Sequence, residues 1–559
     1  MKLKNFILYV LVFTTTLLAA QVAPSKYYIQ FTDKNDSPYS INQPEAFLSQ
    51  RAIDRRSKYD IPVAEEDLPV NPDYLAGVAA TGAVILNPTK WMNGVTIFTE
   101  DQSVLDAIMA LPYVENMVKL ADYPKSVEPK DFFKNESLTP VNQSAEMKSG
   151  WLFGLDYGLA GPQIAQINGA ILHDRGYKGE GMLVAVLDGG FSGTDVHPFF
   201  DSLRMNNRII ATKDFVNKGG SVYTDSGHGN SVLSTMAAFS PGEMIGTAPR
   251  AGYLLLRPED VNSENIIEEY NWVSAAEYAD SAGADVINSS LGYIDFDNPA
   301  FDHTYEDMDG ITNVCTRGAD KAVSKGLMVV NSAGNSGGNS SFPYIGAPAD
   351  GFDVFSIGAV DPNGYRASFS SIGPTYDGRI KPVIAATGQS TFVAYGGSDA
   401  GYGNGTSFSS PIIAGMTTCL MQGFPEMSAI DIMEALKESG SQHSAPDNLL
   451  GWGIPDYGIA SDVLTTIRDN RNMKKPVVAV YPNPTSQGLT LDLILDTAEL
   501  VRIELVSNSG ALLFKREYNL SNADHIIQID QPVISLMSGV YYVRVITSDY
   551  TEVVKFVKQ

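Results

Sequence analysis

The stretch M-L-V-A-V-L-D-G-G, residues 182–190, carries the pattern that decides the fold. Six apolar residues in a row are typical of a strand buried on both faces, and this run ends in Asp188, Gly189 and Gly190. An acidic side chain at the end of a buried strand is costly unless a cation or a hydrogen-bond donor receives it. The paired glycines allow a sharp turn and the close approach of another segment. We therefore expect a core strand that delivers a reactive carboxylate into a loop.

The surrounding sequence repeats this strand pattern at intervals. Further strand-like runs lie at 253–256, 285–290, 327–332 and 354–360, with helical stretches at 264–282 and 311–325. Short apolar strands separated by helices favour an α/β fold, in which helices cover both faces of a parallel sheet. Sites in such sheets form at the carboxyl ends of the strands. The loops that follow these runs are therefore the places to look for chemistry.

Two other loops complete a set of polar groups suited to acyl transfer. The motif D-S-G-H-G-N-S (225–231) places His228 between glycines, and G-N-G-T-S-F-S-S-P (403–411) places Ser407 after a glycine-rich turn. A serine hydroxyl is a poor nucleophile until an imidazole takes its proton. That imidazole in turn needs a carboxylate to fix its tautomer and to stabilise its charged form. The order Asp188, His228, Ser407 is one of the known orders of such a triad.

These motifs resemble those of the subtilisin family of serine proteases, the subtilases. The resemblance runs from Tyr157 to about Ala460 and rests on V-A-V-L-D-G-G, G-H-G-N-S, N-S-S-L-G, V-V-N-S-A-G-N and G-T-S-F-S-S-P. Several separated motifs are far more specific than any one of them. The resemblance implies an endopeptidase with a subtilisin-like fold, polypeptide substrates, an acyl-enzyme intermediate and no required cofactor. It assigns Asp188, His228 and Ser407 to the catalytic triad.

The same resemblance assigns residues around the triad. Asn335, in A-G-N-S-G, matches the asparagine of the oxyanion hole, whose side-chain amide donates to the developing negative charge. The residues that match the edge segment pairing with an extended substrate are Ser290, Leu291 and Gly292. Subtilases also bind structural calcium, for which D-F-D-N-P-A-F-D (295–302) is a candidate segment. No metal ligands are assigned, because the histidines lack paired ligand spacing.

The position of Ser407 also has a local explanation. At the start of a helix, a serine has backbone N–H donors and the positive end of the helix dipole beside it. Pro411 follows four residues later, and we expect it within the first helical turn, where a missing N–H costs little. The stretch is therefore suited to a nucleophile whose attack creates negative charge.

A smaller unit precedes the expected peptidase domain (155–467). Residues 21–120 contain a β-α-β-β-α-β order typical of a ferredoxin-like α+β domain, with its first helix expected at 46–59. This unit resembles the inhibitory propeptide of subtilases, which would act on the peptidase domain in cis. A stable accessory domain that is never removed is the alternative. Residues 121–154 are rich in Pro, Ser, Lys and Glu and are expected to be a linker.

Another unit follows the peptidase domain. After a polar break expected at 468–475, residues 476–559 contain short alternating strands separated by turn residues, which predict an all-β sandwich. The motifs Y-P-N-P (481–484) and S-G-V-Y-Y-V-R-V (538–545) resemble those of the sorting domain of the type IX secretion system. That resemblance implies a Gram-negative source and the secretion machinery as a partner. A generic carbohydrate- or protein-binding sandwich is the alternative.

The N-terminus has the parts of a secretory signal peptide at residues 1–20. Lys2 and Lys4 precede an apolar run from Phe6 to Leu18 that ends in two alanines. An N-terminal membrane anchor is the alternative, but the run is short for a membrane span. No later segment reaches the roughly 18 consecutive apolar residues of a spanning helix. We therefore expect export and no transmembrane segment in the mature chain.

Composition excludes some further classes. The formal net charge of -25 over 559 residues argues against nucleic-acid binding, which needs a basic surface. The cysteines are Cys315 and Cys419, so a disulfide framework is excluded. One bridge or two free thiols both stay open, and we favour buried free thiols.

Together these features predict a secreted or outer-surface serine endopeptidase that is made as a zymogen. The alternative from another class is a catalytically silent surface or binding protein that keeps the fold. A fluorophosphonate probe distinguishes the two, because it labels only an activated serine.

Overall fold

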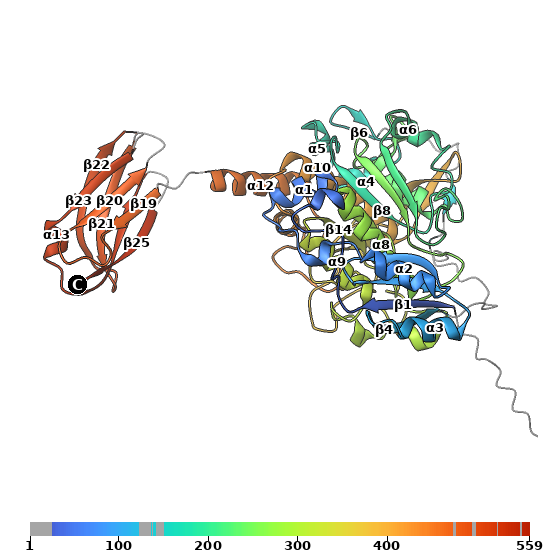
Figure 1. Cartoon of the computed structure of the whole chain (residues 1–559). Coiled ribbons are helices and arrows are strands. Elements are labelled where there is room, and N and C mark those ends of the chain that lie inside the picture. The colour runs from blue at the N-terminus through green and yellow to red at the C-terminus, as the bar shows by residue number, and fades with distance from the viewer. Residues whose placement is uncertain are drawn as a thin grey trace, which may run out of the picture. The chain divides into compact units, whose positions relative to one another are not determined.

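The computed structural model describes residues 25–121, 136, 138–140, 150–472, 477–494, 499–521, 524–547 and 551–559. The expected signal peptide and most of the expected linker lie outside these residues. The chain divides into two compact units, Met1–Leu464 and Thr465–Gln559, and each is described by itself (Figure 1).

A seven-stranded sheet forms the centre of the first unit, with the order β16-β15-β14-β13-β8-β12-β9 and parallel pairing throughout. Its strands are β8 (Leu183–Leu187), β9 (Ile209–Asp214), β12 (Gly252–Arg257), β13 (Val286–Ser289), β14 (Met328–Ser332), β15 (Phe355–Val360) and β16 (Ile384–Thr387). The predicted parallel sheet is confirmed. The two strands that the sequence did not predict, β9 and β16, lie at the sheet edges, where β9 is half exposed and lacks a continuous apolar run.

Helices cover both faces of this sheet. The principal ones are α7 (His228–Ala237), α8 (Ile267–Ala282), α9 (Val314–Ser324) and α10 (Thr406–Gly423). Leu183, Ala185 and Leu187 of β8 share one apolar cluster with residues of α8 and α9. Because side chains alternate along a strand, Val184 and Val186 point to the other face, where α7 and α10 contact the sheet.

The two cysteines lie on helices that cover different faces of the sheet. Cys315 is on α9 and Cys419 is on α10, and both are buried and free. Burial raises the pKa of each thiol well above its ordinary value, so neither forms a thiolate easily. The interpretation of the cysteines as buried free thiols is confirmed.

The N-terminal part of this unit is a four-stranded antiparallel sheet with helices, in the order β2-β3-β1-β4. Its elements are β1 (Lys26–Phe31), α1 (Gln50–Lys58), α2 (Pro72–Ala80), β2 (Val84–Thr89), β3 (Gly94–Phe98), α3 (Gln102–Met109) and β4 (Val114–Ala121). The predicted ferredoxin-like order holds with one correction. The first helix that packs on this sheet is α2, through Tyr74, Leu75 and Val78, whereas the helix predicted at this place is α1, which faces α8 instead.

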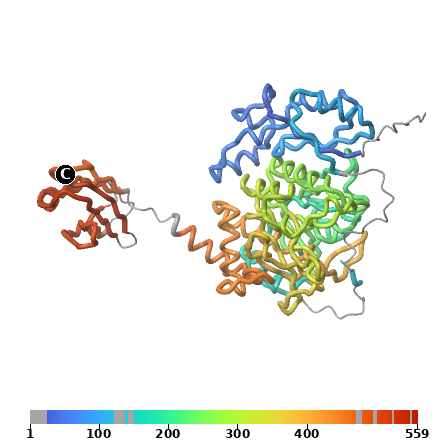
Figure 2. The backbone as a smooth tube through the Cα atoms, turned by 90° about the horizontal axis from the view of Figure 1, so that it is seen from below, coloured from blue at the N-terminus to red at the C-terminus, as the bar shows by residue number. Residues whose placement is uncertain are grey.

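This ferredoxin-like part contacts α8 through a buried cluster of charges. Asp280 of α8 is fully buried and lies 2.6 Å from Arg55 Nη2 and 2.9 Å from Arg56 Nη2. Lys90 Nζ lies 2.8 Å from the same carboxylate. Burial acts to raise the pKa of Asp280, but these three cations hold it below its usual range. The contact between the ferredoxin-like part and α8 is therefore ionic. Figure 2 shows the N-terminal segment lying along one side of the unit.

Replacing Asp280 by asparagine should open this contact. Removing one partner of a buried ion pair costs about 3–5 kcal/mol, because the remaining charges stay buried. The amides of β1 should then exchange with solvent at least about 100-fold faster in the full-length chain. The contribution of the Asp280 carboxylate to the free energy of unfolding is present above the ordinary carboxyl pKa of about 3.9. It is lost as pH falls through the lower pKa that Asp280 has in the folded state.

Asp54→Asn is the matched control for this exchange experiment. Asp54 is exposed on α1, and its carboxylate accepts a hydrogen bond of 2.8 Å from Gln50 Nε2 of the same helix. An exposed side-chain pair of this kind contributes about 0.5 kcal/mol or less. Equal effects of the two variants on β1 would contradict a central role for Asp280.

The second unit is a sandwich of two antiparallel sheets, β19-β20-β23 and β22-β21-β24-β25. Its strands are β19 (Val477–Tyr481), β20 (Leu489–Ile494), β21 (Glu499–Ser507), β22 (Leu512–Leu520), β23 (Asp524–Ile529), β24 (Gly539–Ile546) and β25 (Thr551–Lys558). One apolar core joins the two sheets, as predicted. The polar break expected from residue 468 is displaced, because α12 (Tyr457–Asn472) continues through its first residues. Among the described helices, none is both long enough and apolar enough to cross a membrane.

Candidate active site

The predicted site residues gather at the carboxyl ends of three neighbouring strands. Asp188 directly follows β8, Ser290 directly follows β13, and Asn335 comes three residues after β14. Since β8, β13 and β14 are adjacent in the sheet, their carboxyl ends share one edge. The first residue of α7, His228, and the second residue of α10, Ser407, reach the same place.

Asp188 and His228 form a buried pair. The Oδ1 atom of Asp188 lies 2.8 Å from His228 Nδ1 and also accepts a hydrogen bond from the backbone N–H of Gly189. Asp188 has no exposed surface. Burial raises the pKa of Asp188, and the adjacent imidazole acts against that rise. The pair therefore orients the imidazole through Nδ1 and leaves Nε2 for other contacts.

The glycines around this pair permit a close approach of the two loops. Gly190 has a φ of +150°, and a Cβ atom there would lie 2.7 Å from the carbonyl oxygen of Thr224. The carbonyl oxygen of Gly190 accepts a hydrogen bond of 2.9 Å from the N–H of Gly229. A side chain at either glycine would push the Asp188 loop away from the His228 loop.

The helix that carries Ser407 contains a proline, and another donor replaces the backbone hydrogen bond that this proline cannot make. Because α10 begins at Thr406, Pro411 lies in the second turn and not in the first, which corrects the sequence-based expectation. A proline cannot donate to the carbonyl four residues earlier, which here belongs to Ser407. The Ser290 hydroxyl donates to that carbonyl instead, at 3.0 Å. Ser290 therefore supports the backbone of the Ser407 turn.

The orientation of the Asn335 amide is set by its neighbours. Its Oδ1 atom accepts hydrogen bonds of 2.9 Å from both the N–H and the hydroxyl of Thr406. Two donors on one side identify that atom as oxygen, so the Nδ2 donor faces the opposite way. Nδ2 donates to a carboxylate oxygen of Glu136 at 2.8 Å.

Glu136 is the site residue that the sequence analysis missed. Its Oε1 atom accepts hydrogen bonds from Ser407 Oγ, at 2.6 Å, and from Asn335 Nδ2. Its Oε2 atom lies 2.7 Å from His228 Nε2. The side chain is only 4% exposed. One carboxylate therefore connects the hydroxyl, the imidazole and the amide.

The residues next to Glu136 continue along the same loop region. Thr139–Pro140 form a short strand, β5, that pairs with β18 (Asp399–Gly403) just before α10. A Cβ atom at Gly405 would lie 2.6 Å from the Glu136 carboxylate, so glycine there makes room for this side chain. The sequence held no signal for it, because glutamates are common in a segment of linker composition.

His228 is held in its charged form by this arrangement. Each ring nitrogen faces a carboxylate oxygen, and both contacts require an N–H donor, which only the imidazolium provides. Burial acts to lower the pKa of His228, but Asp188 and Glu136 together raise it to about 10. At neutral pH this imidazole carries both protons and cannot accept another.

Comparison with known proteins places the chain in a family. Residues 179–453 match the model described as the subtilase family, Peptidase S8. Subtilisin DY of Bacillus licheniformis is 32% identical over 271 residues, which cover 48% of this chain and 86% of that protein. The chain belongs to the subtilase family of serine-type endopeptidases. Subtilisin NAT of Bacillus subtilis subsp. natto is 31% identical over 281 residues, which are 50% of this chain and 65% of that protein.

The regions on either side of this subtilase domain match other families. Residues 26–137 match the Peptidase S8 propeptide domain of Bacteroidota, and this match ends one residue after Glu136. Residues 479–559 match the secretion system C-terminal sorting domain. Among solved structures, one with a similar backbone is titled "Structure of Prenylagaramide maturation protease PagA". It has 22% sequence identity and a TM-score of 0.43, and the match covers 53% of this chain and 98% of that one. The three-part organisation of this subtilase is therefore the one that the sequence predicted.

The segment after β13 borders the site of this subtilase. The carbonyl of Leu291 accepts a hydrogen bond of 3.1 Å from Asn331 Nδ2, which fixes the segment against the end of β14. A Cβ atom at Gly292 would make one ordinary van der Waals contact, 3.8 Å from the carbonyl oxygen of Ala347. The segment is therefore not crowded at this glycine.

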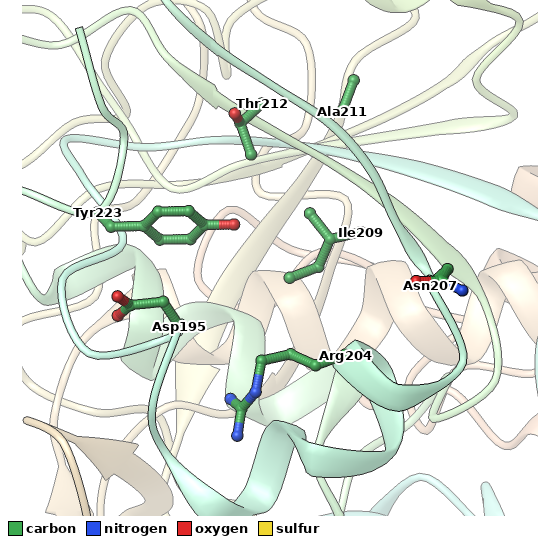
Figure 3. Close-up of a pocket in the computed structure, with 7 residues that line it drawn as sticks. All are labelled: Asp195, Arg204, Asn207, Ile209, Ala211, Thr212 and Tyr223. Atoms are coloured by element: carbon green, nitrogen blue, oxygen red, sulfur yellow. The ribbon is translucent and has the colours of Figure 1, made fainter.

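A separate surface pocket lies between β9 and α6 (Asp201–Met205). Its lining includes Arg204, Ile209 and Tyr223, and the side chains of Ile209 and Tyr223 point toward each other (Figure 3). None of the residues that line it belongs to the predicted site of this subtilase. The predicted site at the strand ends therefore lies outside this pocket.

Proposed function

We propose that this subtilase hydrolyses peptide bonds through an acyl-enzyme intermediate, with Ser407 as the nucleophile. The observation that carries the proposal is the convergence on Glu136. A hydroxyl, an imidazole and an amide donor that all contact one planar carboxylate also surround the position of a reacting carbonyl. The strand-end location and the membership of the family support the same assignment.

In the proposed reaction, His228 accepts the proton of Ser407 as the Oγ atom bonds to the scissile carbonyl carbon. Asp188 orients the imidazole and stabilises its charged form. Asn335 Nδ2 and the backbone N–H of Ser407 donate to the resulting oxyanion. His228 then gives its proton to the leaving amine as the C–N bond breaks, and water hydrolyses the ester by the same path in reverse.

The substrate is proposed to be an extended polypeptide. Ser290, Leu291 and Gly292 form an edge segment beside the nucleophile, and pairing with such an edge is a common way to bind an extended chain. The uncrowded surroundings of Gly292 support this role, as does the burial of Leu291, which anchors the segment. No step of the proposed reaction uses a group other than the side chains and backbone of this chain and water.

We infer that the described form is an inhibited zymogen. The propeptide domain, proposed at 21–120, contacts the peptidase domain through Asp280, and the proposed linker 121–154 carries Glu136 into the site. The carboxylate accepts the hydrogen bond that the Ser407 hydroxyl would otherwise donate to His228, and it keeps His228 protonated. Cleavage within 121–154 would let Glu136 leave the site, so the Ser407 hydroxyl would be free to donate to His228 and the pKa of His228 would fall.

We also propose that the chain is exported in two stages. The expected signal peptide at 1–20 would direct it across the inner membrane. The C-terminal sandwich, which matches a secretion system sorting domain, would then address it to the type IX machinery. The enzyme would act outside the cell or at its outer surface.

The test is labelling of the processed protein with a fluorophosphonate, which reacts with an activated serine hydroxyl. We expect one adduct, located at Ser407 by mass spectrometry, and hydrolysis of peptide substrates by the same preparation. The matched control is Ser409→Ala, since the Ser409 hydroxyl donates within α10 to Thr406 and should not affect labelling. Processed protein with an intact, unlabelled Ser407 would support the alternative, a silent scaffold.

A further inference from the structure

Three buried glutamates converge where β12 leads into α8. Glu259 lies two residues beyond β12, Glu264 lies in the following loop, and Glu268 is the second residue of α8. One carboxylate oxygen from each lies within 4.8 Å of the other two. The side chains of Glu259 and Glu268 have no exposed surface, and Glu264 is 4% exposed.

Two of these carboxylates use only one of their oxygen atoms in hydrogen bonds. Glu259 Oε2 accepts from the Tyr293 hydroxyl at 3.1 Å, and Glu268 Oε2 accepts from the N–H of Asn265 at 2.6 Å. The buried Oε1 atoms of Glu259 and Glu268 have no hydrogen-bond partner within the part of the chain that the structure describes. A buried carboxylate without a partner is costly, so these two atoms point to a ligand that supplies positive charge.

Other buried carboxylates of this chain contact cationic side chains, which offset the free-energy cost of burying a negative charge. Asp280 contacts three cationic side chains, and Asp214 lies 3.0 Å from Arg257 Nη1. Arg257 is also the cation that acts on Glu259, but it already contacts Asp225 at 2.8 Å. Burial and the neighbouring carboxylates raise the pKa of Glu259 to about 8, and burial with Glu259 and Glu264 raises that of Glu268. Without a cation, the ionised form of these carboxyl groups is therefore disfavoured.

We propose that Glu259, Glu264 and Glu268 bind a divalent cation of the calcium type. Calcium takes oxygen ligands, carboxylates above all, at about 2.3–2.6 Å. Two oxygen atoms that touch one such ion lie at most about 5 Å apart, and the three oxygens here satisfy that limit. Zinc is disfavoured because the cluster contains no histidine or cysteine.

The proposed ion would brace the segment that borders the catalytic site. Tyr293, which donates to Glu259, directly follows Gly292, and its N–H donates to Ala347 at 2.8 Å. On the other side, the N–H of Asp297 donates to the Glu264 carbonyl at 2.8 Å. That bond joins the cluster to the segment 295–302, which the sequence analysis noted as a calcium candidate. The ion would thus connect the loop after β12 with the loop after β13.

Binding is tested on the full chain after removal of metal with a chelator. We expect calcium to bind with a stoichiometry of one at this cluster in titration calorimetry and to raise the thermal midpoint by several degrees. Terbium should replace calcium and emit when tyrosine is excited, because Tyr293 contacts the site through Glu259. Absence of both calcium binding and terbium emission would overturn the proposal.

The variant that tests the residues is Glu259→Gln with Glu268→Gln, and Glu306→Gln, at an exposed position, is its control. The double variant should lose at least about tenfold in calcium affinity. In chelator it should melt at a higher temperature than the native chain, because it removes two buried carboxyl groups that are costly without a cation. Unchanged calcium affinity in the double variant would overturn the proposal. Should that protein fail to fold, Glu268→Gln alone serves, with the loss of terbium emission as its measurement.

Discussion

The full-length chain with Ser407→Ala is expected to accumulate uncleaved, with peptide hydrolysis reduced by about 10⁶-fold, a magnitude known from subtilisin itself. Without the hydroxyl no acyl-enzyme forms, so neither substrate hydrolysis nor cleavage within residues 121–154 can proceed. The remaining rate would come from Asn335 and from binding alone. Intact mass of the purified protein over time, together with hydrolysis of a peptide library, measures both effects.

The control for this experiment is Ser409→Ala, which keeps the Ser407 hydroxyl and should mature at the native rate. Addition of a small amount of native enzyme to the Ser407→Ala protein separates cleavage between molecules from cleavage within one. Normal maturation of Ser407→Ala in the absence of any other protease would contradict self-processing. Hydrolysis at the native rate by the same variant would exclude Ser407 as the nucleophile.

The parts of the fold that the sequence predicted are those with a strong local signal. The run before Asp188 is apolar at every position, and the structure buries every residue of β8. Residues that follow such strands must lie at one edge of a parallel sheet, so the positions of Asp188, Ser290 and Asn335 could be anticipated from the order of the strands. The edge strand β9 lacked this signal, because one of its sides faces solvent and carries polar residues.

The sequence could not predict contacts that depend on where distant segments meet. Glu136 lies 271 positions before Ser407, and nothing in its neighbourhood distinguishes it from other glutamates of the linker. The helix α2 was missed because it has only nine residues and contains Gly77, which weakens a helical pattern. Pro411 was placed one turn too early, because the exact start of a helix depends on its cap and not on its apolar spacing.

Buried carboxylates in this acidic chain have three different kinds of surroundings, and only the structure distinguishes them. Asp280 is neutralised by cations from the propeptide domain. Asp188 is matched by one imidazole, which suits a group that must stabilise a transient positive charge. Glu259 and Glu268 have no such partner among the described residues, and so they carry the argument for a bound cation. Burial alone therefore does not identify the role of a carboxylate.

The second large effect is expected from Glu136→Gln. Loss of the carboxylate removes one of the two charges that hold His228 in its protonated form. A charge-assisted hydrogen bond contributes about 1.5–3 kcal/mol, so the pKa of His228 should fall from about 10 by about 1 to 2. Nuclear magnetic resonance of labelled histidine in the uncleaved Ser407→Ala chain measures this change directly. Glu115→Gln, at an exposed position of β4, is the matched control.

The sign of this effect also predicts how pH controls the inhibited form. Because the pKa of His228 is raised in the folded chain, the contact with Glu136 is fully stabilising below the ordinary imidazole pKa of about 6.5. Its contribution is lost as pH rises through about 10. In a chain that retains Ser407, fluorophosphonate should therefore label the uncleaved form slowly at neutral pH and faster as pH approaches 10. With Glu136→Gln, labelling at neutral pH should be about 10- to 100-fold faster. An unchanged pKa of His228 in this variant, or labelling that does not depend on residue 136, would show that the glutamate only occupies space.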